Sequence, residues 1–202
     1  MKYKVFVFDF DGTLVDSVNL KINAYFKIFQ PYSLSDSLIS SVLKEFPDLN
    51  RYDTIQVIID RGKLSANATA LSELYTAFVL DEILRSPYLE FATEILNFLQ
   101  ESNYSVYLSS NTPQVVLDEI IEKMKWKRYF NAIFGYPHLK IDTLKRVIGS
   151  GNYPSSSVLV IGDGDSDKIS AELNDTDFFR VEGNSLFPLI KYLNIGELIN
   201  VK

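Results

Sequence analysis

The chain has 202 residues, of which 47% are hydrophobic and 23% are charged. This composition suits one compact domain, or one domain with an insertion, and does not suit a disordered chain. There is no cysteine and only one histidine, His138, which excludes disulfides, thiolate catalysis and multi-histidine metal sites. The net charge of −6 comes without a basic cluster, and the apolar run at residues 5–8 is short. We therefore expect a cytoplasmic protein that binds neither nucleic acid nor a membrane.

The first predicted element is a strand over residues 5–8, whose sequence Val-Phe-Val-Phe is apolar on both faces. This pattern is typical of a fully buried strand in a parallel sheet. The strand ends at Asp9, and Gly12 follows as a turn residue.

Residues 17 to about 86 show a different pattern, because apolar residues recur there with helical spacing and no convincing strand is present. Helices are predicted over residues 19–29, 34–46, 53–59 and 68–84. We interpret this segment as an all-helical insertion after the first strand. Pro87 marks the return to the sheet domain, and the next helix is predicted over residues 91–99.

Two later runs, residues 104–108 and 158–161, also read as buried strands, and each leads into small or polar residues before a helical pattern. The helices are predicted to start near residues 113 and 166, and shorter strands are predicted over residues 132–134 and 177–181. Strands that alternate with helices indicate an α/β fold with a doubly wound, parallel, Rossmann-like sheet. Ligands bind at the carboxyl ends of such strands, so the three polar segments are expected to converge there.

Two carboxylates, Asp9 and Asp11, directly follow the first strand in the sequence Asp-Phe-Asp-Gly-Thr-Leu. Their burial is unfavourable without a cation, and Mg²⁺ suits a carboxylate oxygen of Asp9 together with the backbone carbonyl of Asp11. This arrangement leaves the Asp11 side chain free for proton transfer. The alternatives are a polar turn and a calcium loop. The calcium loop fails because Leu14 stands where glycine is required and Leu20 where glutamate is required.

The segment from Asp9 to Leu14 resembles the first signature of the haloacid dehalogenase superfamily. The resemblance is to its phosphatase branch with a helical cap, which includes phosphoglycolate phosphatases and β-phosphoglucomutases. Dehalogenases of this superfamily lack the second aspartate, so Asp11 indicates phosphoryl chemistry. The resemblance implies a core catalytic domain formed by residues 1–16 and 87–202, and a cap domain formed by residues 17–86.

The segment Ser-Asn-Thr-Pro at residues 110–113 is similar to the second signature. The resemblance implies that the Ser110 hydroxyl and the backbone amide of Asn111 bind phosphate where the next helix begins. Ser109 is a rival for this role, and an ordinary helix cap is the alternative for either serine.

The segment Gly-Tyr-Pro-His-Leu-Lys at residues 135–140 resembles a variant of the third signature. It implies that Lys140 pairs with the nucleophile and the phosphate, offsetting negative charge in the transition state. Lys145 is the rival, and a solvated surface lysine is the alternative.

The segment Gly-Asp-Gly-Asp-Ser-Asp at residues 162–167 resembles the fourth signature. It implies that Asp163 is a metal ligand and that Asp167 orients the lysine or the waters on the metal. Asp165 lies outside the pattern and is interpreted as solvated. In the predicted cap, Arg51 could bind a substrate phosphate or carboxylate, and a surface arginine near a helix start is the alternative.

The four signatures occur in the superfamily's order along the chain. The resemblance implies a magnesium-dependent phosphatase for a small phosphorylated molecule, with Asp9 as the nucleophile and Asp11 as the general acid and base. Mg²⁺ would be held by Asp9, Asp11 and Asp163. The alternatives are a sugar phosphomutase of the same superfamily, a phospho-accepting signalling domain and a non-catalytic binding protein. No substrate identity or oligomeric state is predicted.

Overall fold

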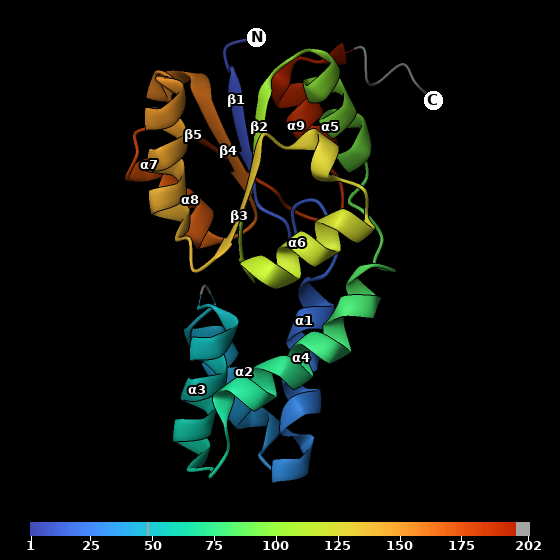
Figure 1. Ribbon diagram of the computed structural model, residues 1–202, viewed down its shortest axis with the longest axis vertical. Helices are drawn as coiled ribbons and strands as arrows, with labels where there is room; N and C mark the ends of the chain where they lie inside the picture. Colours follow the sequence, from blue (N-terminus) through green and yellow to red (C-terminus); the bar gives the residue numbers. More distant parts are fainter. Residues whose placement is uncertain (48, 197–202) are drawn as a thin grey trace. The chain divides into compact units, whose positions relative to one another are not determined.

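The computed structural model describes residues 1–47 and 49–196, and its core is a parallel β-sheet (Figure 1). Within the described residues the sheet has five strands in the order β3-β2-β1-β4-β5, and each neighbouring pair is parallel. The doubly wound α/β fold predicted from the alternating pattern is therefore confirmed. The strands are β1 (Val5–Phe8), β2 (Ser105–Pro113), β3 (Ala132–Tyr136), β4 (Val158–Gly162) and β5 (Asp177–Arg180).

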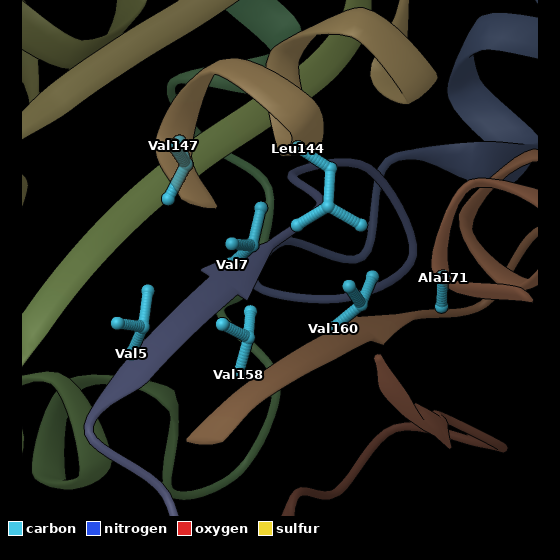
Figure 2. Close-up of a cluster of buried hydrophobic side chains, with 7 residues drawn as sticks. All are labelled: Val5, Val7, Leu144, Val147, Val158, Val160 and Ala171. Carbon is cyan, nitrogen blue, oxygen red and sulfur yellow. The ribbon is translucent and has the colours of Figure 1, made fainter. Parts of the chain in front are cut away.

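The central strand β1 is buried on both faces, as its continuous apolar sequence predicts. Val5 and Val7 point to the face that is covered by α7 (Lys140–Gly151) and α8 (Asp165–Glu172). There they pack with valines of β4 and with apolar residues of both helices (Figure 2). Full burial of a valine contributes about 1.5–3 kcal/mol, so this cluster firmly anchors the two helices that carry candidate site residues.

The other face of the sheet is covered by a second set of helices. α5 (Ala92–Glu101) and α9 (Phe187–Leu193) lie on the side opposite α7 and α8 (Figure 1). α6 (Gln114–Lys123) contacts β2 and β3. Short 3₁₀ helices occupy Lys127–Tyr129 and Ser155–Ser157.

The contacts within the chain separate two compact units: Met1–Asp16 with the chain from Pro87 onward, and Ser17–Ser86. Among its described residues the second unit has helices and no strand. The side chains of Asn50 and Asn67 accept hydrogen bonds from backbone amides in the first turn of the third and fourth of these helices, which fixes where the two helices begin. The helices are α1 (Val18–Phe29), a 3₁₀ turn (Gln30–Tyr32), α2 (Asp36–Glu45), α3 (Arg51–Gly62) and α4 (Ala68–Ile83). In neither unit does the described part of the chain contain a helix with the length and apolar character of a membrane span.

The carboxyl ends of β1, β2 and β4 meet at one edge of the sheet, because β2 and β4 flank β1. The strand order reverses at β1, which is where folds of this kind bind ligands. β2 extends further than predicted: it runs to Pro113, with a shift in its register against β3 after Ser109. The polar residues expected after this strand therefore belong to the strand itself.

Candidate active site

Asp9 is the first residue after the central strand. Its backbone amide donates to the carbonyl oxygen of Ile161 at 2.9 Å, so one further hydrogen bond of the β1–β4 ladder holds it in place. Only 7% of the residue is exposed. The chain then turns through Gly12, whose φ of 74° is a left-handed conformation that glycine adopts without strain. This order of residues places one buried carboxylate at the sheet edge and a second, Asp11, in the turn.

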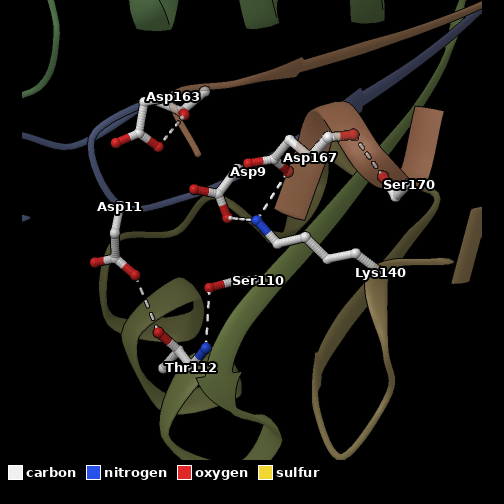
Figure 3. Close-up of polar contacts among 9 residues, drawn as sticks. Asp9, Asp11, Ser110, Thr112, Lys140, Asp163, Asp167 and Ser170 are labelled. Carbon is white, nitrogen blue, oxygen red and sulfur yellow. Dashed lines mark hydrogen bonds and ion pairs between the residues drawn. The ribbon is translucent and has the colours of Figure 1, made fainter. Parts of the chain in front are cut away.

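Lys140 joins two carboxylates from different elements (Figure 3). Its Nζ lies 2.9 Å from Oδ1 of Asp9 and 2.8 Å from Oδ1 of Asp167. Lys140 is the first residue of α7 and is buried, so the packing of this helix on the sheet fixes the base of its long side chain. Charged hydrogen bonds at a buried site are stronger than exposed ion pairs, and they hold these three side chains together.

Asp163 and Asp167 belong to the turn after β4 and to the first turn of α8. One side-chain oxygen from each of Asp9, Asp163 and Asp167 lies within 4.8 Å of the other two. Gly162 permits this approach, because a Cβ at its position would lie 2.3 Å from Cγ of Asp167. On the other side, Oγ1 of Thr13 donates to Oδ1 of Asp163 at 3.4 Å.

The donor set of this cluster fits Mg²⁺. Carboxylate oxygens are the ligands that hard divalent cations prefer. Oδ2 of Asp167 is buried and has no hydrogen-bond partner within the described parts of the chain. Buried polar atoms are normally paired, so this oxygen fits a water or cation in the cluster. Four aspartates, Asp11 included, also exceed the single lysine in charge, and a divalent cation would offset that excess.

Burial and mutual repulsion raise the pKa values of Asp9, Asp163 and Asp167. Burial, reinforced by Asp9 and opposed by Lys140, raises the pKa of Asp163 to about 6. Burial raises the pKa of Asp167 to about 7, although Lys140 opposes the shift. The pKa of Asp9 is also raised by burial, against the effect of Lys140. Burial acts to lower the pKa of Lys140, but Asp9 and Asp167 outweigh burial and raise it, so the lysine is a cation.

Asp11 is held by Thr112, a residue that the sequence interpretation did not single out. Oγ1 of Thr112 donates to Oδ2 of Asp11 at 3.0 Å, and the backbone amide of Thr112 donates to Oγ of Ser110 at 3.1 Å (Figure 3). The only signal in the sequence is its place in the segment 110–113. The rival Ser109 is also buried, and its Oγ has no hydrogen-bond partner in the described structure. Ser110 as the phosphate ligand stays a prediction.

Asp165 is exposed but not merely solvated, because it pairs with Arg180 at the end of β5. Nη2 of Arg180 lies 2.5 Å from Oδ1 of Asp165, and Nη1 donates to the carbonyl oxygen of Asp163 at 2.6 Å. The sequence interpretation did not identify Arg180, since nothing in its local pattern separates it from an ordinary strand residue.

Arg51 is buried inside the second unit, with 7% of the residue exposed. Nη1 donates to Oγ1 of Thr76 and to the carbonyl oxygen of Ser72, both on α4. The guanidinium carbon lies 4.8 Å from the ring centroid of Tyr75. These contacts exclude the alternative of a surface arginine and connect α3 to α4.

Two other residues considered from the sequence are exposed. Lys145, the rival for the lysine role, is on α7 but outside the buried cluster. His138 is exposed and packs edge-on against Phe134, with 5.9 Å between ring centroids.

Comparison with known proteins agrees with this geometry. The family model described as haloacid dehalogenase-like hydrolase matches residues 6–181. A curated relative, phosphoglycolate phosphatase from Pseudomonas fluorescens, is 26% identical over 178 residues, and the match covers 84% of this chain. It covers 65% of the relative, so the chain spans less than two thirds of that protein's length.

Solved structures share the fold. The protein named HAD-hydrolase YfnB from Bacillus subtilis, solved bound to magnesium, superposes with a TM-score of 0.73 at 16% identity, covering 96% of this chain and all of that one. CbbY from Rhodobacter sphaeroides, solved in complex with phosphate, gives a TM-score of 0.74 at 11% identity, covering 90% of this chain and 87% of the other.

Proposed function

Because this chain belongs to the haloacid dehalogenase-like hydrolase family, we propose that it is a magnesium-dependent phosphatase for a small-molecule phosphomonoester. The observation that carries the proposal is the buried ammonium group of Lys140 between Asp9 and Asp167, at the carboxyl edge of the sheet. The likeness to a phosphatase and to proteins solved with magnesium and with phosphate adds support.

We assign the metal site to the carboxylates of Asp9 and Asp163 and to the backbone carbonyl of Asp11. Asp167 would bond a metal-bound water through Oδ2, the buried oxygen that has no hydrogen-bond partner within the described residues. When bound there, Mg²⁺ would neutralise charge on the phosphate and orient it for attack.

Asp9 is the proposed nucleophile. One of its carboxylate oxygens forms a bond to phosphorus while the bond from phosphorus to the leaving oxygen breaks, which gives an aspartyl phosphate. Lys140 and Ser110 donate hydrogen bonds to the non-bridging oxygens, together with the backbone amides of Phe10 and Asn111. Lys140 already contacts Asp9 and is a cation, so it needs little reorganisation to stabilise developing negative charge.

Asp11 is the proposed general acid and base. In its protonated form it gives a proton to the leaving oxygen in the first step. In the second step it takes a proton from water, whose oxygen bonds to phosphorus as the bond to Asp9 breaks and inorganic phosphate leaves. The hydrogen bond from Thr112 supports this role, because it fixes the Asp11 carboxyl group in the turn.

We assign residues 17–86 as a cap that excludes bulk water and selects the leaving group, with Arg51 as a candidate contact to the substrate. The place of this unit in the chain supports the assignment, since it is inserted between Asp16 and Pro87, directly after the first signature.

The proposed function is tested by assaying purified protein against a panel of phosphomonoesters, including 2-phosphoglycolate, with Mg²⁺ and with a chelator. We expect release of inorganic phosphate that requires Mg²⁺ and disappears in Asp9→Asn. Asp81→Asn removes one exposed carboxylate from α4 and should retain full activity. Undiminished turnover in chelator, or in Asp9→Asn, contradicts the proposal. Transfer of the phosphoryl group to a sugar without release of phosphate would identify a mutase instead.

A further inference from the structure

We propose that Arg180 is a positioning residue that holds the Asp163 loop, residues 163–165, in the conformation that binds the divalent cation. The inference rests on the metal site proposed above. Arg180 lies outside all four signature segments, so the resemblance to the family gives it no role.

The guanidinium group of Arg180 bonds the loop at two points. Arg180 is the last residue of β5 and is paired with Gly162, the last residue of β4, in the register of the sheet. From there its Nη1 reaches the backbone oxygen of Asp163 at 2.6 Å, and Nη2 reaches the carboxylate of Asp165 at 2.5 Å. A planar guanidinium with several donors can satisfy both acceptors at once, which a single ammonium group cannot do equally well.

Local structure alone holds this loop weakly. Gly164 is the N-cap of α8 and provides no side-chain cap for that helix. The hydrogen bond from Thr13 to the Asp163 carboxylate is long, at 3.4 Å. The contacts from Arg180, at 2.6 and 2.5 Å, are short and tie the loop to the neighbouring strand.

The loop also needs to be held against repulsion. One side-chain oxygen of Asp163 lies within 4.8 Å of one from Asp9, so the two carboxylates repel one another. Before a cation binds, this repulsion favours displacement of the loop away from Asp9. The positive charge and the hydrogen bonds of Arg180 oppose that displacement, so cation binding begins from a loop that is already in place.

The alternative explanation is that Arg180 and Asp165 form an exposed ion pair without a functional role. The Arg180 and Asp165 side chains are 35% and 66% exposed, and exposed pairs contribute little to stability. The two explanations predict different results. An ordinary surface pair would leave cation affinity unchanged, whereas a positioning residue would alter cation affinity more than it alters stability.

The test is calorimetric titration of Mg²⁺ into metal-free protein. Arg180→Met should bind Mg²⁺ about 10–100-fold more weakly than the unaltered chain, the range typical for partners of metal ligands. Arg180→Lys should give an intermediate affinity. The matched control is Arg61→Met, which removes another partly exposed arginine–carboxylate pair, that with Glu45 on the second unit, and should bind normally. Asp163→Asn verifies that the titration measures this site, and thermal unfolding verifies that each variant is folded.

The outcomes separate this inference from the proposed function. If the unaltered chain binds Mg²⁺ through Asp163 and Arg180→Met binds it equally well, the inference is overturned while the metal site stands. If Arg180→Met does not fold, Arg180→Lys decides, and an unchanged affinity in that variant overturns the inference. If the unaltered chain shows no Mg²⁺ binding that depends on Asp163, both the proposed metal site and this inference are wrong.

Discussion

The ammonium group of Lys140 donates to the Asp9 carboxylate across 131 residues of sequence, joining the first residue of α7 to the end of β1. The same group bonds Asp167 in α8. One cation is thus shared by two buried carboxylates from separate elements. Such a group is oriented before any substrate arrives, which is the condition under which a fixed charge contributes most to catalysis.

The first prediction concerns this lysine. Lys140→Met should lower kcat/KM for phosphomonoesters by about 10²–10³-fold, because it removes a preorganised donor to the phosphate. Lys145→Met is the matched control, since Lys145 is exposed on the same helix, and it should retain normal kinetics. Steady-state kinetics of both variants decides between the two lysines. Normal kinetics in Lys140→Met, or a larger loss in Lys145→Met, would contradict the assignment of Lys140.

The second prediction concerns the pH dependence of stability without metal. The pKa values of Asp163 and Asp167, about 6 and about 7, lie above the ordinary value of 3.8. The folded chain therefore holds protons that the unfolded chain has already lost. The stabilising contribution of these groups is complete below the ordinary pKa and is lost as the pH rises through the folded pKa values. In chelator, the melting temperature should therefore fall as the pH rises from about 4 to about 7, the interval between the ordinary and the raised pKa values.

The double variant Asp163→Asn/Asp167→Asn serves as the reference for that measurement, because it lacks both titrating groups. Subtracting its pH profile isolates their contribution from that of all other groups. Added Mg²⁺ should restore the unaltered chain most at high pH, where the carboxylates are ionised. A difference profile that rises with pH would be inconsistent with the raised pKa values.

The third prediction concerns Arg51. Arg51→Ala removes a charged hydrogen bond to Thr76 and a contact with Tyr75. We expect it to destabilise the second unit by about 1.5–3 kcal/mol in urea unfolding. Thr76→Val removes the acceptor and keeps the guanidinium. If Arg51 also contacts the substrate, Arg51→Ala should change the order of kcat/KM values among substrates, whereas Thr76→Val should not. Identical rankings in both variants would limit Arg51 to a structural role.

The fourth prediction separates Asp11 from Asp9. A general acid matters least when the leaving group is already good, so Asp11→Asn should lose more activity on an alkyl phosphate than on p-nitrophenyl phosphate. The difference should fall in the range of about 10²–10⁴-fold that is typical of general acid–base catalysis. With the aryl ester, phosphoenzyme should accumulate as an initial burst in rapid-quench experiments. Equal losses on both esters without a burst would remove the proton-transfer role of Asp11.

Much of the fold was predictable because its strongest signals are local. The strand predicted over residues 5–8 is β1, since a run buried on both faces is unmistakable. The prediction for β2 was too short, because Ser109 and Ser110 read as loop residues. Both are buried in the strand, and only for Ser110 does the described structure show a side-chain partner, since its Oγ accepts a hydrogen bond from the backbone amide of Thr112. The helix predicted over residues 53–59 begins earlier, at Arg51, because Asn50 caps it.

The family was also predictable, because its signatures are short and local, and the comparison confirms the resemblance. The contacts between secondary-structure elements could not be predicted from the sequence. The hydrogen bond from Thr112 to Asp11 joins residues 101 apart, and that from Arg180 to the Asp163 loop depends on the register of β4 with β5. Neither residue type is unusual in its own segment, so only the packed sheet brings these pairs together.

The most direct test of the central claim is a crystal structure of the protein with Mg²⁺ and fluoroberyllate, which mimics a phosphoryl group and requires no knowledge of the substrate. The account predicts beryllium bonded to a carboxylate oxygen of Asp9, with its fluorides hydrogen-bonded by Lys140 and Ser110. Beryllium bonded to Asp11 or Asp163, with Asp9 unmodified, would contradict the assignment of Asp9 as the nucleophile.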